Sequence, residues 1–193
     1  MNPFKLMLAG VLITTGATAA TADQPGAWPQ EPKSFMGVNL QGDFLERVSV
    51  CPPDVTKLET PCRMATESPD VFLIQGAKTG FVFLGYQLFA HLSGSTIEKL
   101  VFTGPASSSE LVANMLRTDY GPPVAATANM IKLNSGATFV NEVLLWQSER
   151  LLLKSQRDEK DIGTYSVILT IAPTALSDTQ DQARPSTSNL SKL

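Results

Sequence analysis

Two kinds of residue in this chain could carry out hydrolytic chemistry, namely its carboxylates and a serine assisted by a histidine. Paired carboxylates can act as general acid and general base, and the candidates are Glu98, Glu110, Asp119, Glu142 and Glu149. A serine nucleophile needs a base, and His91 is the only histidine. The chain contains no Gly-x-Ser-x-Gly motif, and the sequence cannot place any two of these carboxylates at the separation that an acid–base pair requires. We therefore predict no catalytic residue, and a cell-envelope hydrolase with a site hidden from sequence spacing is the alternative function.

Anion, metal and cofactor sites are not indicated either. The serines of residues 104–109 precede a helix, where free N–H groups can hold an anion, but no phosphate-binding lysine or glycine-rich loop accompanies them, so we interpret them as helix caps. Residues 158–161, Asp-Glu-Lys-Asp, lack the ligand spacing of a calcium loop and predict a solvated turn. Two cysteines and one histidine are too few for a zinc site. We predict no metal and no cofactor.

Aromatic side chains are candidates for a recognition surface, because they are enriched where partners dock. The candidates are Trp28, Phe89, Tyr120 and Trp146, and we expect core packing for most of them. Phe89 differs, because it falls with Gln87 and His91 on the strand face opposite a continuous apolar row. We predict Gln87, Phe89 and His91 as a possible recognition surface.

The strongest predicted strand forms a hairpin with the strand after it, and the main helix is expected to follow this hairpin. Residues 81–92 alternate in polarity, and Ser93-Gly94-Ser95 predicts a turn into a strand over 97–103. Ser107 and Glu110 have the spacing of a capping box. The expected apolar stripe of the helix consists of Leu111, Val112, Met115, Leu116 and Tyr120, and Gly121-Pro122-Pro123 predicts its end.

The remaining segments predict further strands. They are 35–40, 44–50 (a strand or a helical turn), 71–74, 130–133, 138–146, 151–155 and a last strand with Tyr165, Val167, Leu169 and Ile171 on one face. Strands in a run, one helix and more strands indicate an α+β fold. We predict a single domain with a curved antiparallel sheet and one main helix packed on one face.

The two ends of the chain differ in composition from this domain. Residues 1–22 have a lysine, an apolar run and the small residues of a secretory signal peptide, and the run is too short to span a membrane. Residues 23–34 predict an extended lead segment that Trp28 pins to the domain, residues 35–173 the domain, and residues 174–193 a disordered tail. After cleavage we expect no stable membrane insertion. An exported location, periplasmic or secreted, favours a structural disulfide between Cys51 and Cys62.

Several short motifs of the domain form a recognisable set. They are Phe35-Met36-Gly37-Val38, Cys51-Pro52, Tyr120-Gly121-Pro122-Pro123 and Trp146. In this order the chain resembles small exported bacterial proteins of unknown function over residues 35–171. The resemblance implies structure and export, and it assigns no catalytic residue.

The composition limits the class of partner. The net charge is −3 and no basic stripe is present, which argues against nucleic acid. We expect a non-catalytic binding or interaction module, with an envelope protein or a glycan as its possible partner. A deep polar pocket with converging carboxylates favours the enzyme, whereas a flat apolar face or a free strand edge favours binding.

Overall fold

The computed structural model describes residues 28, 31–54, 58–77, 85–132 and 136–172. The predicted signal peptide, most of the lead segment, the predicted tail and the first part of the strand predicted at 81–92 lie outside the described residues.

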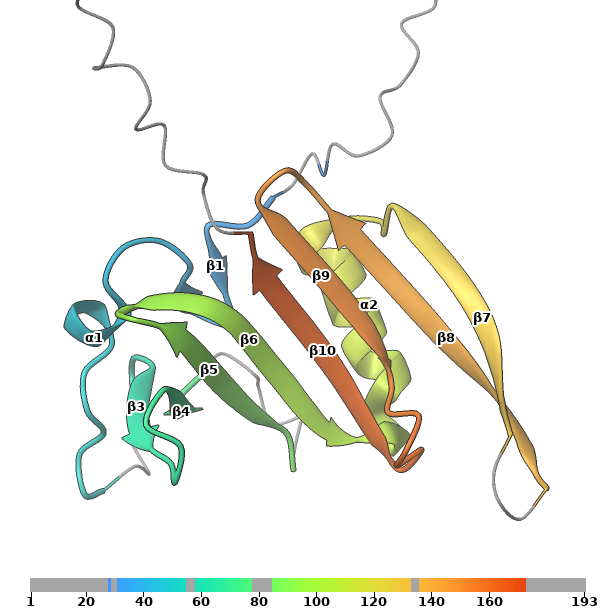
Figure 1. The fold of residues 1–193 in the computed structure, drawn as a ribbon, viewed down its shortest axis with the longest axis horizontal. Coiled ribbons are helices and arrows are strands. Elements are labelled where there is room, and N and C mark those ends of the chain that lie inside the picture. The colour runs from blue at the N-terminus through green and yellow to red at the C-terminus, as the bar shows by residue number, and fades with distance from the viewer. Residues whose placement is uncertain (1–27, 29–30, 55–57, 78–84, 133–135, 173–193) are drawn as a thin grey trace, which may run out of the picture.

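One antiparallel sheet of eight strands dominates the described structure (Figure 1). In chain order the strands are β3 (Cys62–Ala65), β4 (Val71–Gln75), β5 (Gln87–Ser93), β6 (Thr96–Pro105), β7 (Ala125–Lys132), β8 (Thr138–Gln147), β9 (Leu151–Arg157) and β10 (Thr164–Ile171). Their order in the sheet is β3-β4-β5-β6-β10-β9-β8-β7. Two consecutive meanders therefore meet where β6 pairs with β10, and β3 and β7 form the two edges.

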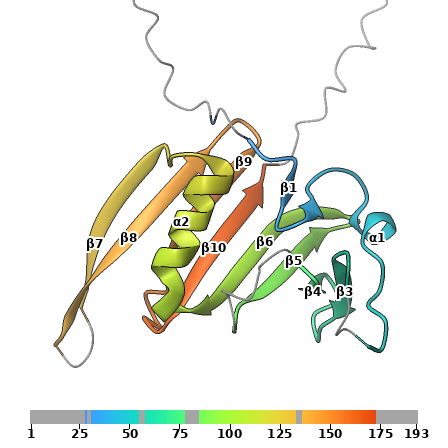
Figure 2. The same ribbon diagram turned by 180° about the vertical axis from the view of Figure 1, so that it is seen from behind.

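Helix α2 (Ser109–Tyr120) connects β6 to the far edge strand β7 and covers one face of the sheet (Figure 2). Its buried residues are Val112, Ala113, Leu116 and Tyr120, which recur at helical spacing and pack against the apolar face of the strands. The predicted α+β architecture is confirmed. Leu111 was wrongly assigned to the stripe: it is 51% exposed, because it lies about 100° around the helix from Val112, on the side away from Ala113.

The start of α2 also differs from the prediction. A 3₁₀ turn, η2 (Ala106–Ser108), precedes the helix, and the N-cap residue Ser108 makes no side-chain capping bond, so the capping box is wrong. The Ala106 N–H donates instead to the Gly163 carbonyl at 2.7 Å. A contact with a distant turn therefore fixes the entry of the helix.

Both tryptophans of the chain hold the other end of α2. Trp28 Nε1 donates to the Tyr120 carbonyl at 2.8 Å, and Trp146 Nε1 donates to the Gly121 carbonyl at 2.9 Å. Gly121 has a φ of 78°, a value that favours glycine and ends the helix as predicted. Because the last carbonyls of a helix lack partners within it, these indoles satisfy groups that would otherwise be buried without a donor. Trp28, Tyr120 and Trp146 belong to the core, as expected for most of the aromatic candidates.

The N-terminal segment covers the same face of the sheet as α2. The strand predicted at 35–40 is wrong, because Met36 and Gly37 have φ of 51° and 86° and form a tight turn between the short strands β1 (Ser34–Phe35) and β2 (Val38–Asn39). Of the strand and the helical turn that were left open for residues 44–50, a helical turn is present as α1 (Phe44–Arg47), whose N-cap Asp43 accepts from the Glu46 N–H at 3.1 Å.

The β3 edge is closed by the segment before it. Cys51 and Cys62 form the predicted disulfide, with the two sulfurs 2.03 Å apart. The Cys51 N–H donates to the Arg63 carbonyl at 3.0 Å, and the Arg63 N–H donates to the Ser49 carbonyl at 2.8 Å. The sequence did not predict β3, which pairs with β4 on one side and is covered by these two bonds on the other.

Candidate binding surface

The sheet face opposite α2, which we call the open face, carries an apolar row that crosses all eight strands. In strand order its residues are Met64, Leu73, Phe89, Val101, Ile168, Lys154, Leu145 and Ala125, each opposite the next in the strand pairing. We call these residues the central row. No described helix packs on this face, which Figure 1 shows towards the viewer. Lys154 is the one charged residue in the row.

The predicted recognition residues lie on the open face. Leu88, Ala90 and Leu92 are buried on the other side of β5, and alternation therefore places Gln87, Phe89 and His91 on the open side. Phe89 is half-buried in the central row between Leu73 and Val101. The structure thus puts Phe89 in a continuous surface that extends well beyond its own strand.

A row of uncharged polar residues borders the central row on one side. Gln87 is opposite Thr103, Thr103 is opposite Ser166, and Ser166 is opposite Gln156. The hydroxyls of Thr103 and Ser166 are hydrogen-bonded at 2.9 Å. This border offers hydroxyl and amide groups to a partner and carries no charge.

The other border of the central row contains a lysine. Its members, each opposite the next, are Val71, His91, Lys99, Thr170, Leu152 and Gln147. Among the paired positions of the described strands, Lys99 and Lys154 are the only charged residues that alternation places on the open face. Glu98 is the unpaired residue of a β-bulge at the end of this border. Glu98 also acts on His91, where its negative charge opposes the lowering of the pKa that burial causes, so the open face and this bulge together carry two lysines and one glutamate, whereas the chain as a whole is acidic.

His91 is not placed for serine catalysis. Burial, and next to it the positive charge of Lys99, lowers the pKa of His91 below its usual 6.5. The neutral form of the imidazole is therefore favoured. Within the described part of the chain no hydrogen bond joins His91 to a serine, so the nucleophile–base pair of a serine hydrolase is not formed there.

Two of the five candidate carboxylates do come together. Glu110 and Glu142 line a polar pocket of about 210 Å³ between α2 and the strands β8 to β10, together with Arg117, Arg157 and Tyr165. Glu142 is 3.4 Å from Arg117, and its side chain is 56% exposed. The carboxylate is thus held by an arginine in a shallow, wet position, which does not favour a general acid.

Sequence reasoning missed the buried polar residues of the strands next to this pocket. Asn141 is 1% exposed, and its amide donates to the Arg157 carbonyl at 3.2 Å and accepts from the Arg157 N–H at 2.9 Å. Burial raises the pKa of Tyr165, and the neighbouring Ser155 hydroxyl opposes this rise. The Ser155 hydroxyl is itself buried and makes no hydrogen bond of ordinary geometry with the described residues. No motif marks these residues, because only strand pairing brings them together.

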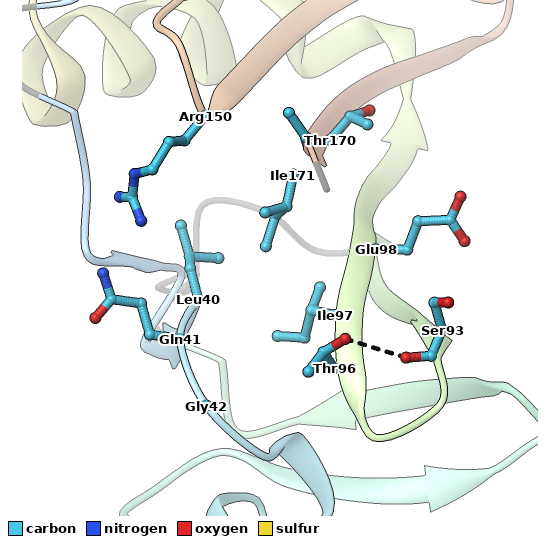
Figure 3. Close-up of a pocket in the computed structure, with 11 residues that line it drawn as sticks. Leu40, Gln41, Gly42, Ser93, Thr96, Ile97, Glu98, Arg150, Thr170 and Ile171 are labelled. Carbon is cyan, nitrogen blue, oxygen red and sulfur yellow. Dashed lines mark hydrogen bonds between the residues drawn. The ribbon is translucent and has the colours of Figure 1, made fainter. Parts of the chain in front are cut away.

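A larger pocket of about 580 Å³ lies at one end of the sheet (Figure 3). Leu40, Ile97 and Ile171 point into it, and Arg150 and Gln41 lie along one side. Arg150 is already paired with Glu31. The pocket therefore offers an aliphatic interior and a neutralised cation rather than a set of reacting groups.

The remaining predicted features are structural. Asp158 accepts from the Lys160 and Asp161 N–H groups, and Asp161 accepts from the Gly163 N–H and the Thr164 hydroxyl. The acidic turn thus uses its carboxylates to shape the β9–β10 connection. Among the described residues no group of three His, Cys, Asp or Glu side chains could hold a metal ion.

The edge strand β7 is a second exposed surface. Seven of its eight residues are exposed, and no described strand pairs with its outer side. Its hairpin with β8 extends away from the rest of the sheet (Figure 1) and exposes Met130, Phe139 and Val140 by 66%, 38% and 61%. The β7–β8 hairpin is therefore, like the central row, a surface that could meet a macromolecule.

Comparison with known proteins adds no assignment. No protein-family model, curated protein or solved structure matches this chain. None of the described helices is long and apolar enough to cross a membrane.

Proposed function

We propose that this chain is an exported, non-catalytic binding module whose open face holds an acidic, amphipathic segment of an envelope protein. The proposal rests on the central row, because this row presents apolar side chains from edge to edge of a sheet face that no described helix covers. Extended apolar patches with polar borders are characteristic of docking sites.

The dimensions of the row fit a helical segment. Strands lie about 4.8 Å apart, so the distance between the outermost strands of the row is about 34 Å. A helix of about 20 residues is about 30 Å long, and an amphipathic helix docks by laying its apolar side on such a surface. The row therefore has the length to hold one partner helix.

The chemistry of the face favours an acidic protein over a glycan. Lys99 and Lys154 are complementary to carboxylates that flank the apolar side of a partner helix. Sugar rings bind preferentially on aromatic rings, and Phe89 is the only aromatic residue of the central row. The aliphatic neighbours Leu73, Val101 and Ile168 suit a protein side chain better.

Export is supported by the cysteines and by the N-terminal sequence. The Cys51–Cys62 bond is of the kind that persists in oxidising compartments. Residues 1–22 have the composition of a secretory signal peptide. We therefore propose a periplasmic or secreted location, and this is where the partner should be sought.

The test compares two variants, one replacing the half-buried Phe89 and the other the exposed Leu111 with aspartate. Phe89→Asp places a charge in the central row, whereas Leu111→Asp places one on the outer side of α2. The disulfide-bonded chain and both variants are immobilised and exposed to an envelope extract, with a denatured chain as the background control. Circular dichroism and thermal unfolding show that each variant is folded.

The proposal predicts a captured protein whose retention falls at least about tenfold with Phe89→Asp and is unchanged with Leu111→Asp. A synthetic peptide of its acidic amphipathic segment should bind directly, and more weakly as the salt concentration rises. Equal capture by both variants, or capture of a glycan in place of a protein, would refute the proposal. A captured protein without such a segment would also refute it.

A further inference from the structure

The two edges of the sheet are treated differently by the fold. The outer side of β3 is paired with residues 49–51, which the disulfide holds in place. The outer side of β7 is unpaired in the described structure, over eight residues and without a register shift in its pairing with β8. An unpaired edge presents a row of free N–H and C=O groups to any extended strand.

β7 also lacks the features that normally protect an edge. Proteins block open edges with charged residues, prolines, bulges or short strands. The sequence of β7 is Ala-Ala-Thr-Ala-Asn-Met-Ile-Lys, with one charge at its last position and no proline. The strand is therefore suited to pairing, in contrast to β3.

We propose that β7 pairs antiparallel with β7 of a second copy of this chain, about a two-fold axis through Ala128. In an antiparallel pair, opposite residues lie on the same face of the sheet. A two-fold axis perpendicular to the sheet therefore allows only registers in which residues of the same face are opposite. Placing Ala128 opposite the second copy's Ala128 satisfies this condition.

The side chains of β7 complement one another in this register. Met130 comes opposite Ala126 of the second copy, and Ile131 comes opposite Ala125. Each large apolar residue thus meets an alanine, which leaves it room to lie along the sheet. Thr127 comes opposite Asn129, so that two polar side chains are paired.

The charges are also compatible with a second copy. Lys132 lies at the end of the strand, so the two lysines are at opposite ends of the interface, about 27 Å apart. No like charges face each other. The two-fold pairing uses both β7 edges, and because the β3 edges are closed, assembly stops at two copies.

Pairing would also join the open faces. Ala125 is the last residue of the central row, and in the proposed register it abuts Ile131 of the second copy. Ile131 is in turn opposite Phe139 across the β7–β8 pair. The apolar surface of one copy is therefore continuous with that of the other.

Cysteine cross-linking tests the pairing and its register. Opposite residues of an antiparallel pair are within the Cα separation that a disulfide requires, so Ala128→Cys should form a cross-linked dimer under mild oxidation. Ala126→Cys is the matched control, exposed on the same face of the same strand. Its counterpart in the second copy is about 13 Å away, beyond the reach of a disulfide.

Charge substitution gives a second, independent readout. Sedimentation of the unmodified chain over micromolar to millimolar concentrations should show a monomer–dimer equilibrium. Ala128→Lys places two lysines opposite each other and should raise the dissociation constant at least about tenfold, and mixing it with Ala128→Glu should restore dimers. A monomer at every concentration, cross-linking of Ala126→Cys as efficient as that of Ala128→Cys, or no restoration on mixing would overturn the proposal.

Discussion

Replacing Trp28 with phenylalanine tests whether the lead segment is part of the folded domain. Trp28 is 4% exposed, and its indole N–H donates to the Tyr120 carbonyl at 2.8 Å. Its ring packs edge-on against the Tyr120 ring, with centroids 6.2 Å apart, and Tyr120 stacks on Phe35 at 5.8 Å. The segment before the first strand thus contributes both a hydrogen bond and a ring to the core.

The loss in free energy of unfolding expected for each variant follows from the interactions that the substitution removes. Trp28→Phe keeps a ring but deletes the donor, so a buried carbonyl at the end of α2 loses its partner, at a cost of about 1 to 3 kcal/mol. Trp28→Ala also removes the ring and should cost about 3 to 5 kcal/mol. The larger loss is a substantial part of the stability of an ordinary domain, which is about 5 to 15 kcal/mol.

Urea unfolding followed by circular dichroism measures both losses without relying on tryptophan fluorescence. Trp146→Phe deletes the corresponding bond to the Gly121 carbonyl and should cost at least as much as Trp28→Phe, because Trp146 is fully buried. A Trp28→Phe variant within about 0.5 kcal/mol of the unmodified chain would refute the reasoning. So would a Trp28→Ala variant no less stable than Trp28→Phe.

Three further predictions concern a titration, a buried amide and the disulfide. NMR titration of His91 should give a pKa below 6.5, because burial and a neighbouring lysine disfavour its charged form. Since the unfolded chain then takes up the proton more readily than the folded chain, the free energy of unfolding should decline as the pH falls below about 6.5. This decline should be smaller in His91→Gln. Asn141→Ala leaves the N–H and carbonyl of Arg157 without their partners and should cost about 2 to 4 kcal/mol in urea unfolding. Replacing Cys51 and Cys62 with serine should cost on the order of 3 kcal/mol in the same assay.

Each of these measurements has a matched control. His91 is the only histidine, so its resonances need no separate assignment, and a pKa at or above 6.5 would contradict the account. Asn129 is opposite Asn141 on the exposed edge strand, and Asn129→Ala should change stability by less than about 0.5 kcal/mol; equal losses would refute the role given to Asn141. Addition of reductant should destabilise the unmodified chain and leave the serine variant unchanged.

The sheet could be predicted from the sequence where one face of a strand is buried. β5 and β10 alternate in polarity because alternate residues pack on the core, and the structure confirms strands there. β3 could not be found in this way. Its sequence, Cys-Arg-Met-Ala, has no clear alternation, and it is placed by its pairing with β4 and by backbone bonds to residues 49–51.

The limits of the main helix were predictable at one end only. Gly121 ends α2 through its own backbone conformation, which is a local property that the sequence reveals. The start depends on the bond between Ala106 and Gly163, residues far apart in the chain. The capping pattern of Ser107 and Glu110 was therefore outweighed by a contact that only the folded sheet provides.

The candidate surface could be predicted one strand at a time but not as a whole. Alternation of side chains along β5 places Phe89 on the open face, and this prediction needs no knowledge of other strands. That Val101 and Ile168 come beside Phe89 depends on the register of two further pairings, and a shift of one residue in either would turn them to the core. Register is fixed by the buried faces packed under α2 and the N-terminal segment, so the arrangement of the exposed row is a consequence of core packing. A recognition surface of this kind consists of ordinary Val, Ile and Leu residues whose proximity, rather than their identity, distinguishes them.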